Sequence, residues 1–426
     1  MRAALIYLDI QFDHKGQSIG GQTYDGVGIV YSLISTCLEC DFYHIVDDNS
    51  LEYLGKKLSS IPYKLVAISL FSQQFQIALK IIPYIDPGTK IIVGGPHAIV
   101  DPYSIITKMR ADCVVVGECD EFLVELIEDV IGNKELNKFP NLIYKRDNTI
   151  RQTDGKYVFK NIDKQIKIDY SIFSLHPLFV QKHGVQLTTS RGCLFRCNYC
   201  ANSTLKEIFG NDYTARSIKP EILLSSLEEI KSQIKTDRFI FAGDIFTLDT
   251  KWLRQFMKLY RQQIDLPFEC HTRAEFINKE TVNLLKESGC GGCSLGIESC
   301  SDRIRKRLGR TDSMKNIISS INLLNNHNLH VQGYFMYAIP GEDWDDFALT
   351  SEFLNKGMLD SGVFSVYSSF AKRNERYYSH DYLSLARNKN PENSLFKKSL
   401  DIYRLELEHG LDKGRRLRLK GVGALN

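Results

Sequence analysis

Short apolar runs alternate with longer amphipathic segments along the first 135 residues. The apolar runs lie at 3–9, 41–46, 64–70, 90–95 and 111–117, with helical patterns such as 23–38 between them. Strands that alternate with helices at this spacing predict a parallel sheet with helices on both faces. We therefore expect an α/β fold that begins with a Rossmann-like, flavodoxin-like domain over residues 1–135. Such sheets bind ligands at the carboxyl ends of their strands.

The alternation weakens over residues 136–183 and resumes at residue 184. The segment 141–153 predicts a small hairpin that turns at Asp147 and Asn148, and the rest of 136–183 predicts a linker. Six strand–helix units follow over residues 184–370, two fewer than a complete (β/α)₈ barrel. They predict a partial (β/α)₆ barrel whose active groups lie on the loops after the strands. Residues 371–426 predict a short helical C-terminal region with a basic tail.

Composition excludes several classes of function. The net charge of +3 is too balanced to predict a nucleic-acid partner, and no apolar run is long enough to cross a bilayer. Eleven cysteines in a long chain without a recognisable export signal indicate reduced thiols. We therefore expect a cytoplasmic protein without a membrane or nucleic-acid partner.

Three of the cysteines are crowded into the stretch "SRGCLFRCNYCAN", residues 190–202. Cys193, Cys197 and Cys200 follow the spacing CxxxCxxC directly after the first strand of the predicted barrel. Three thiolates are one short of a closed zinc site, and no second CxxC pair lies nearby. An iron–sulfur cubane held by three cysteines keeps one iron open for a substrate. The spacing favours this open-site cubane, with zinc and structural thiols as the alternatives.

The cysteine loop resembles the signature of the radical S-adenosylmethionine (SAM) enzymes, and later segments match the family in order. The resemblance implies a 4Fe–4S cluster and SAM as cofactors. It implies that Tyr199 lies near the adenine and that Asp244 meets the methionine amino group, although Gly243 stands where many members have a second acidic residue. Arg273 would meet the methionine carboxylate. Further SAM contacts are expected from Glu298, Ser299 and the segment 333–342.

Each of these residues also has a structural interpretation. Arg273 could form a surface ion pair. Glu298 ends a predicted strand and could cap the next helix. Tyr199 could pack against its own loop.

The front domain resembles the cobalamin-binding domain that precedes the barrel in one branch of that family. The resemblance depends on "IIVGGPHAIVDP" followed by "ADCVVVGECDEF". The implied cofactor contacts are Ser69, Ser72, Gly94, Gly95, Pro96, His97, Gly117 and Glu118. The Asp-x-His-x-x-Gly motif, which supplies a cobalt ligand in classical cobalamin carriers, is absent, so we expect no protein histidine on the lower face of cobalt. We expect His97 to contact the edge of the cofactor or solvent, and His14 to lie on the surface.

The two resemblances together imply a cobalamin-dependent radical SAM methyltransferase. It would methylate an unactivated carbon of a small-molecule biosynthetic intermediate, through hydrogen abstraction by an adenosyl radical and methylcobalamin. An external electron donor such as flavodoxin or ferredoxin would supply the electron. A second hypothesis keeps the cofactors but replaces methylation by ring closure, rearrangement or oxidation. A third is a non-catalytic cluster protein that senses redox state or binds a partner.

The remaining cysteines favour ordinary packing. Cys113 and Cys270 resemble small buried hydrophobic residues. Packing is also favoured over a redox pair for Cys37 and Cys40. An auxiliary cluster formed by Cys290, Cys293 and Cys300 is the less favoured interpretation of those three, because it lacks a fourth ligand. Arg373, Arg376 and the basic tail suggest a solvated surface more than an anion site.

Overall fold

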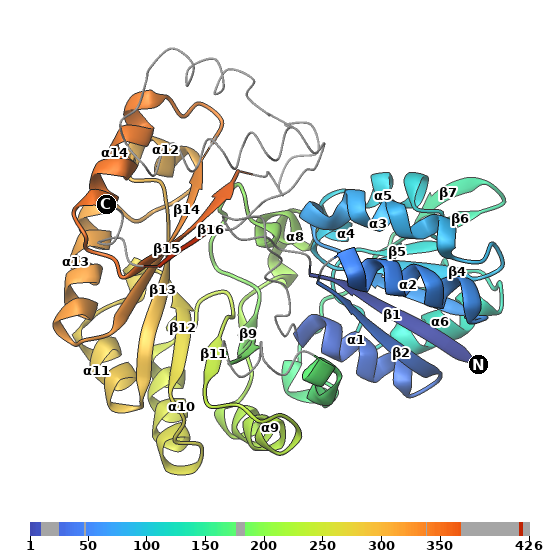
Figure 1. Ribbon diagram of the computed structural model, residues 1–426, viewed down its shortest axis with the longest axis horizontal. Coiled ribbons are helices and arrows are strands. Elements are labelled where there is room, and N and C mark those ends of the chain that lie inside the picture. Colours follow the sequence, from blue (N-terminus) through green and yellow to red (C-terminus); the bar gives the residue numbers. More distant parts are fainter. Residues whose placement is uncertain (10–24, 47, 176–183, 338, 368–416, 421–426) are drawn as a thin grey trace.

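The computed structural model describes residues 1–9, 25–46, 48–175, 184–337, 339–367 and 417–420. Figure 1 shows two lobes, each built around a seven-stranded sheet. The blue to cyan lobe contains the first sheet, and the yellow to orange lobe contains the second. His14, Arg373, Arg376 and the helix predicted in the C-terminal region lie outside the described residues.

The first sheet confirms the predicted flavodoxin-like fold. Its five parallel strands have the order β2-β1-β3-β4-β5, which is the flavodoxin order. The strands are β1 (Arg2–Leu8), β2 (Glu39–Ile45), β3 (Leu65–Ser69), β4 (Lys90–Gly94) and β5 (Cys113–Val115). The helices are α1 (Asp25–Ser35), α2 (Asp48–Ser60), α3 (Phe75–Ile81), α4 (Pro96–Val100), α5 (Pro102–Lys108) and α6 (Leu123–Ile131).

The central strands of this sheet are buried on both faces. Leu5 and Ala67 belong to one hydrophobic core, whereas their neighbours Ile6 and Ile68 belong to another. Successive side chains of a strand point to opposite faces, so a strand between two helical layers needs apolar residues at every position. This explains why the sequence shows continuous apolar runs here.

The predicted hairpin forms and joins the first sheet. Strands β6 (Leu142–Arg146) and β7 (Thr149–Gln152) are antiparallel, and β6 also pairs antiparallel with β5. Asp147 and Asn148 both have positive φ, 49° and 59°, as a two-residue hairpin turn requires. The sheet therefore continues beyond residue 135. The described part of the following segment, up to Leu175, contains the 3₁₀ turns Ile162–Lys164 and Tyr170–Leu175.

The second sheet confirms the predicted partial barrel. Six parallel strands follow one another across this sheet in chain order. Among the described strands, none pairs with the free side of β8 to close the barrel. They are β8 (Val185–Leu187), β11 (Phe239–Phe241), β12 (Phe268–Thr272), β13 (Cys290–Glu298), β14 (His330–Tyr337) and β15 (Ser361–Val366). The helices are α8 (Ala201–Phe209), α9 (Pro220–Gln233), α10 (Thr250–Gln263), α11 (Lys279–Glu287), α12 (Asp302–Arg307), α13 (Met314–Asn326) and α14 (Trp344–Asn355).

Two short features of this lobe were not expected. Strand β16 (Leu417–Lys420), within the predicted basic tail, pairs antiparallel with β15 at the sheet edge. Strands β9 (Ser190–Arg191) and β10 (Arg216–Ser217) form a separate antiparallel pair beside the cysteine loop.

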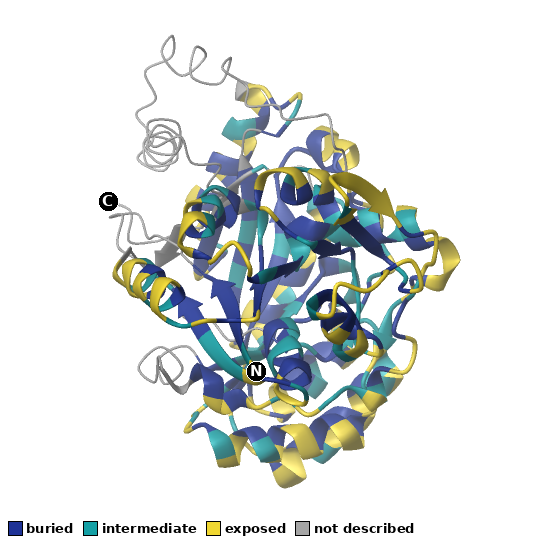
Figure 2. Cartoon of the chain, turned by 90° about the vertical axis from the view of Figure 1, so that its right-hand side faces the viewer, coloured by how far each residue is buried: buried dark blue, intermediate teal, exposed yellow. Residues whose placement is uncertain are grey.

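Local sequence explains where several of these helices begin. The Asp249 carboxylate accepts hydrogen bonds from the backbone amides of Lys251 and Trp252 at the start of α10. Asp343 does the same for α14, where Asp346 completes a capping box. Figure 2 shows the strands mainly buried and the outward helix faces exposed. In the part of the chain that the structure describes, no helix is long and apolar enough to span a membrane.

Candidate cofactor-binding site

The cysteine loop leaves the carboxyl end of β8 and is fixed by backbone hydrogen bonds. The amide of Asn198 donates to the carbonyl of Leu308, 3.0 Å away, and the Ser203 hydroxyl donates to the carbonyl of Cys197 at 2.8 Å. Gly192 has φ +83°, and a side chain there would lie 2.4 Å from the carbonyl oxygen of Thr214. The loop is therefore held in one conformation by α8 and the C-terminal end of α12.

The three loop cysteines lie close enough to influence one another electrostatically. Burial, followed by the negative charge of Asp244 and then by the other two cysteines, raises the pKa of Cys200 to about 12. The three sulfur atoms do not all lie within 4.8 Å of one another. The three thiols are therefore not arranged as the ligands of a single ion.

Arg273 reaches the cysteine loop from the end of β12. One guanidinium nitrogen lies 3.4 Å from the sulfur of Cys197, and two others bind the carboxylate of Glu275 at 2.5 and 3.1 Å. The guanidinium also stacks over Phe195, 3.6 Å from the ring centroid. Arg273 thus does form an ion pair, but with only 6% of the residue exposed it is a buried pair and not the surface pair considered for it.

Tyr199 and Glu298 meet inside the lobe. The Tyr199 hydroxyl donates to the Glu298 carboxylate at 3.0 Å and accepts from Arg310 at 3.2 Å. Glu298 has φ 69°, a conformation that few side chains adopt and that is often found at functional sites. Ser301, not Glu298, caps α12, so the capping role considered for Glu298 is wrong.

Three charged residues near this pair were missed by the sequence analysis. Asp312 accepts hydrogen bonds from Arg310 at 2.9 and 3.1 Å and forms an ion pair with Arg305. Burial would raise the pKa of Asp312, but Arg310 and Arg305 outweigh it and hold that pKa below its usual value. Burial raises the pKa of Glu298. This network of Tyr199, Glu298, Arg310, Asp312 and Arg305 joins the cysteine loop to the end of β13.

Asp244 and Ser299 occupy different environments. The Asp244 carboxylate accepts a hydrogen bond of 2.6 Å from the side chain of Asn202, in the first turn of α8. Asp244 also lines the cavity described below. Ser299 is fully buried, and its hydroxyl accepts from the amide of Ser301 at 3.2 Å.

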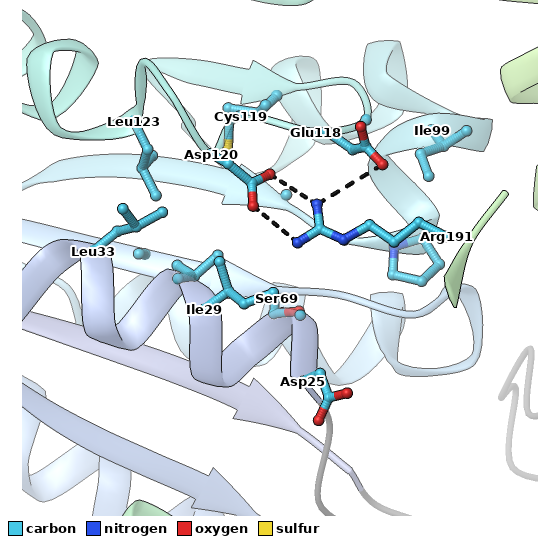
Figure 3. Close-up of a pocket in the computed structure, with 18 of the residues that line it drawn as sticks. Asp25, Ile29, Leu33, Ser69, Ile99, Glu118, Cys119, Asp120, Leu123 and Arg191 are labelled. Atoms are coloured by element: carbon cyan, nitrogen blue, oxygen red, sulfur yellow. Dashed lines mark hydrogen bonds and ion pairs between the residues drawn. The ribbon is translucent and has the colours of Figure 1, made fainter. Parts of the chain in front are cut away.

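A cavity of about 300 Å³ lies between the two lobes (Figure 3). The first lobe contributes the carboxyl ends of β3, β4 and β5 together with one side of α1 and α6. The second lobe contributes the start of the cysteine loop, one residue of α8, Tyr213 and Asp244. Figure 3 shows Ile29 and Leu33 of α1 facing the cavity from one side and Leu123 of α6 from the other.

The structure places six of the eight residues predicted in the first lobe at this cavity. They are Ser69, Gly94, Gly95, Pro96, Gly117 and Glu118. A side chain on Gly94 would meet no protein atom within 4 Å, so this backbone is open to a ligand. Gly95 has φ +91°, and a side chain there would lie 2.8 Å from the amide nitrogen of Leu70.

Ser72 and His97 do not line the cavity. They bind each other, with 2.9 Å between the Ser72 hydroxyl and Nδ1 of His97. The ring of His97 lies against Phe75, 4.6 Å between centroids, and only 6% of the residue is exposed. The contact with solvent considered for His97 is therefore wrong.

Charged side chains join the two lobes around the cavity. Arg191 forms a two-pronged ion pair with Asp120, both distances 2.9 Å, and Arg216 binds Glu118 at 2.9 and 3.0 Å. The buried carboxylate of Asp25 accepts hydrogen bonds from the Tyr170 hydroxyl and from the amide and hydroxyl of Thr188. Figure 3 shows Arg191 reaching across the cavity mouth toward Asp120 and Glu118.

The front-lobe cysteines match the packing interpretation. The thiols of Cys37 and Cys40 hydrogen-bond to the carbonyls of Ile34 and Asp41. Burial raises the pKa of Cys40 to about 12, which disfavours the reactive thiolate.

Residues 187–354 match the model of the Radical SAM superfamily. These residues form a radical SAM domain. The matched residues run from the end of β8 almost to the end of α14 and include the cysteine loop, Asp244, Arg273 and Glu298.

Curated relatives of this radical SAM chain include methyltransferases. An uncharacterized methyltransferase of Pyrococcus horikoshii is 27% identical over 293 residues, which cover 67% of this chain and 62% of the relative. Bacteriochlorophyllide d C-12(1)-methyltransferase of Chlorobaculum tepidum is 23% identical, over 66% of this chain and 58% of the relative. The chain thus spans about 60% of the length of these relatives.

Solved radical SAM structures share the fold. The radical SAM methyltransferase TsrM of Kitasatospora setae superposes with a TM-score of 0.67 at 13% identity, covering 87% of this chain and 75% of that one. The cobalamin-dependent enzyme OxsB gives a TM-score of 0.64 at 15% identity, covering 91% of this chain and 55% of that one. Both alignments extend over the two lobes.

Proposed function

We propose that this protein is a cobalamin-dependent radical SAM methyltransferase that methylates an unactivated carbon of a small molecule. The observation that carries the proposal is the cavity between the lobes. One wall consists of the predicted cobalamin edge of the first sheet, and the other includes Gly192 and Asp244 beside the cysteines. Two cofactors bound to these walls would face a common space.

Residues of the barrel suit the SAM side of the site. Cys193, Cys197 and Cys200 would hold a 4Fe–4S cluster, because three thiols supply soft ligands and leave one position open. Arg273, beside Cys197, would offer a positive charge to the methionine carboxylate. Asp244 offers a carboxylate for the amino group, and Tyr199 with Glu298 offers a ring and an acceptor for the nucleoside.

Residues of the first lobe suit cobalamin. The cavity continues from the sheet edge between the sheet and α1, where Leu5, Ile29, Leu33, Leu123 and Ile127 make an apolar lining. Such a slot accepts the aromatic base of the nucleotide tail, and the bare backbone of Gly94 allows close approach. Among the described residues that line the cavity there is no histidine, in keeping with a cobalt that takes no histidine ligand from the protein.

When bound, the cluster and SAM supply a carbon-centred radical, and cobalamin supplies a methyl group. The chain itself binds, orients and excludes water. Holding the reactants side by side makes their reaction effectively intramolecular. Ion pairs of Arg191 with Asp120 and of Arg216 with Glu118 hold the two walls together. An external donor such as flavodoxin or ferredoxin would supply the electron.

Several relatives support methylation, and one supports an alternative. Cytidylyl-2-hydroxyethylphosphonate methyltransferase of Streptomyces wedmorensis is 21% identical. The anaerobic magnesium-protoporphyrin IX monomethyl ester cyclase of Synechocystis, 22% identical, favours ring closure or oxidation as the second candidate. A redox sensor without catalysis has no need for Arg273 buried against Cys197.

Product analysis under anaerobic conditions tests the proposal. Purified protein reconstituted with iron, sulfide and cobalamin should cleave SAM after chemical reduction. With substrate present it should form both 5′-deoxyadenosine and S-adenosylhomocysteine. Formation of 5′-deoxyadenosine alone, with a product that gains no CH₂, would establish the cyclase-type alternative. No cobalt after reconstitution would reject the role given to the first lobe.

A further inference from the structure

A second group of three cysteines lies in the barrel lobe, apart from the cysteine loop. Cys270 of β12 and Cys290 and Cys293 of β13 have sulfur atoms that all lie within 4.8 Å of one another. The sulfur atoms of Cys270 and Cys293 are 3.7 Å apart. All three residues are at most 4% exposed. None of them lines the cavity between the lobes. We call this group the strand trio.

A bulge in β13 brings two members of the strand trio to the same face. Cys290 pairs with Phe268 and Gly292 with Glu269, so Gly291 is an extra residue in β13. In a regular strand, residues three apart point to opposite faces. The extra residue places Cys290 and Cys293 on one face, beside Cys270. Glycine at the bulge position adds no side chain to this crowded edge.

The strand trio lies on the helix-covered face of the sheet. Cys270 is two residues from Phe268 along β12, so the two side chains share a face. The ring of Phe268 meets Tyr260 of α10, 5.2 Å between centroids. His271, on the opposite face, packs against Tyr334 instead. The trio is therefore separated from the cysteine loop, which lies at the ends of the strands.

We propose that the strand trio binds one thiophilic metal ion, Zn²⁺ or Cu⁺, through three thiolates. Zinc–thiolate bonds of about 2.3 Å put ligands of a tetrahedral ion roughly 3.8 Å apart, which is close to the distance between Cys270 and Cys293. Thiolate ligands select zinc, Cu⁺ or iron–sulfur clusters. A cubane places its cysteines farther apart, because each one holds a different iron. The compact trio therefore suits a single ion.

Binding of a metal ion would release the protons of the three thiols. The thiol of Cys290 lies 3.3 Å from the carbonyl of Gly292, inside the bulge that brings the trio together. This site is independent of the proposed function.

Metal counting on the full-length protein tests the proposal. In a variant in which Cys193, Cys197 and Cys200 are all alanine, the metal content reports on other sites. This variant is incubated with Zn²⁺ or Cu⁺ without oxygen, desalted and analysed for metal. We expect one equivalent of one of these ions, together with a higher midpoint of thermal unfolding.

Further substitutions locate the bound ion. Adding Cys270→Ala or Cys293→Ala should remove the bound equivalent. Adding Cys300→Ala, which changes a buried cysteine outside the strand trio, should not. Two results would overturn the proposal. The first is that the variant lacking the three loop cysteines, in which the strand trio is intact, binds neither Zn²⁺ nor Cu⁺. The second is that the bound metal is retained after a cysteine of the strand trio is replaced.

Discussion

The two lobes present different chemistry at the edges that face each other. The first lobe offers glycine backbone, an apolar slot and carboxylates that are already paired with arginines of the barrel lobe, whereas the barrel lobe offers a group of three thiols and the carboxylate of Asp244. The first arrangement suits selection of a ligand by shape, and the second suits selection by metal coordination and charge. A substitution at the edge of the barrel lobe should therefore impair cofactor binding more than a substitution of similar size at the edge of the first lobe.

The largest effect is expected from Cys197→Ala. This change removes one of the three thiolates proposed to hold the cluster, so iron content should fall and SAM cleavage should drop to the background of the assay. Anaerobic reconstitution followed by iron analysis and measurement of 5′-deoxyadenosine checks it. Cys113→Ala, which changes a buried cysteine of the first lobe, is the matched control. This variant should keep both its iron content and its SAM cleavage. Equal iron in the two variants would disprove the assignment.

The next largest effect is expected from Arg273→Ala. Hydrogen bonds to charged groups contribute about 1.5–3 kcal/mol, so the KM for SAM should rise about 10- to 150-fold. The KM of Arg273→Lys should lie between the values of the parent protein and of Arg273→Ala, because lysine keeps the positive charge but lacks the planar guanidinium group. Arg303→Ala, an exposed arginine of the same lobe, serves as the control. A KM unchanged in Arg273→Ala would contradict the carboxylate contact.

A smaller effect is expected in the first lobe from Gly94→Leu. The added side chain would project into space that cobalamin needs. Overpacking of about 1–3 kcal/mol corresponds to a loss of roughly 5- to 150-fold in cobalamin affinity. Gly94→Ala should lose less, and both variants should unfold near the temperature of the parent protein. Titration with cobalamin followed by absorbance measures this. Undiminished affinity in Gly94→Leu would place the cofactor elsewhere.

The smallest effect is expected from Tyr199→Phe. Loss of the hydroxyl leaves the buried Glu298 carboxylate without this donor, which should lower the free energy of unfolding by about 1–3 kcal/mol. SAM cleavage should fall less than in Arg273→Ala, because the aromatic ring remains. Denaturant unfolding measures the change, with Tyr53→Phe on an exposed tyrosine as control. Identical unfolding curves would show that the network adds no stability.

Local patterns in the sequence were enough to predict both sheets. Apolar runs such as 64–70 and the turn at Asp147 and Asn148 depend on neighbours in the chain, so periodicity and turn chemistry reveal them. The CxxxCxxC loop is equally local. Residues that act through distant partners could not be found in this way. Glu118 was expected to contact a cofactor, and its ion pair with Arg216 spans 98 residues of sequence.

The buried charges of the network were hidden for a related reason. Arg305, Arg310 and Asp312 belong to "DRIRKRLGRTD", which by composition resembles an exposed, charged helix. Only the packing of this segment against β13 shows that they are buried. The strand trio was missed because a one-residue bulge at Gly291 changes which side chains share a face.

The hydrogen bonds of Asp25 bear on whether the first lobe can be produced as a separate fragment. Its carboxylate is in the first lobe, whereas Thr188 is in the second and Tyr170 lies between them. A shortened protein that stopped before Val185 would leave that carboxylate without Thr188, and it would leave Asp120 and Glu118 without Arg191 and Arg216. We expect these unpaired carboxylates to destabilise such a fragment, so studies of cofactor binding by the front half are best made in the intact polypeptide.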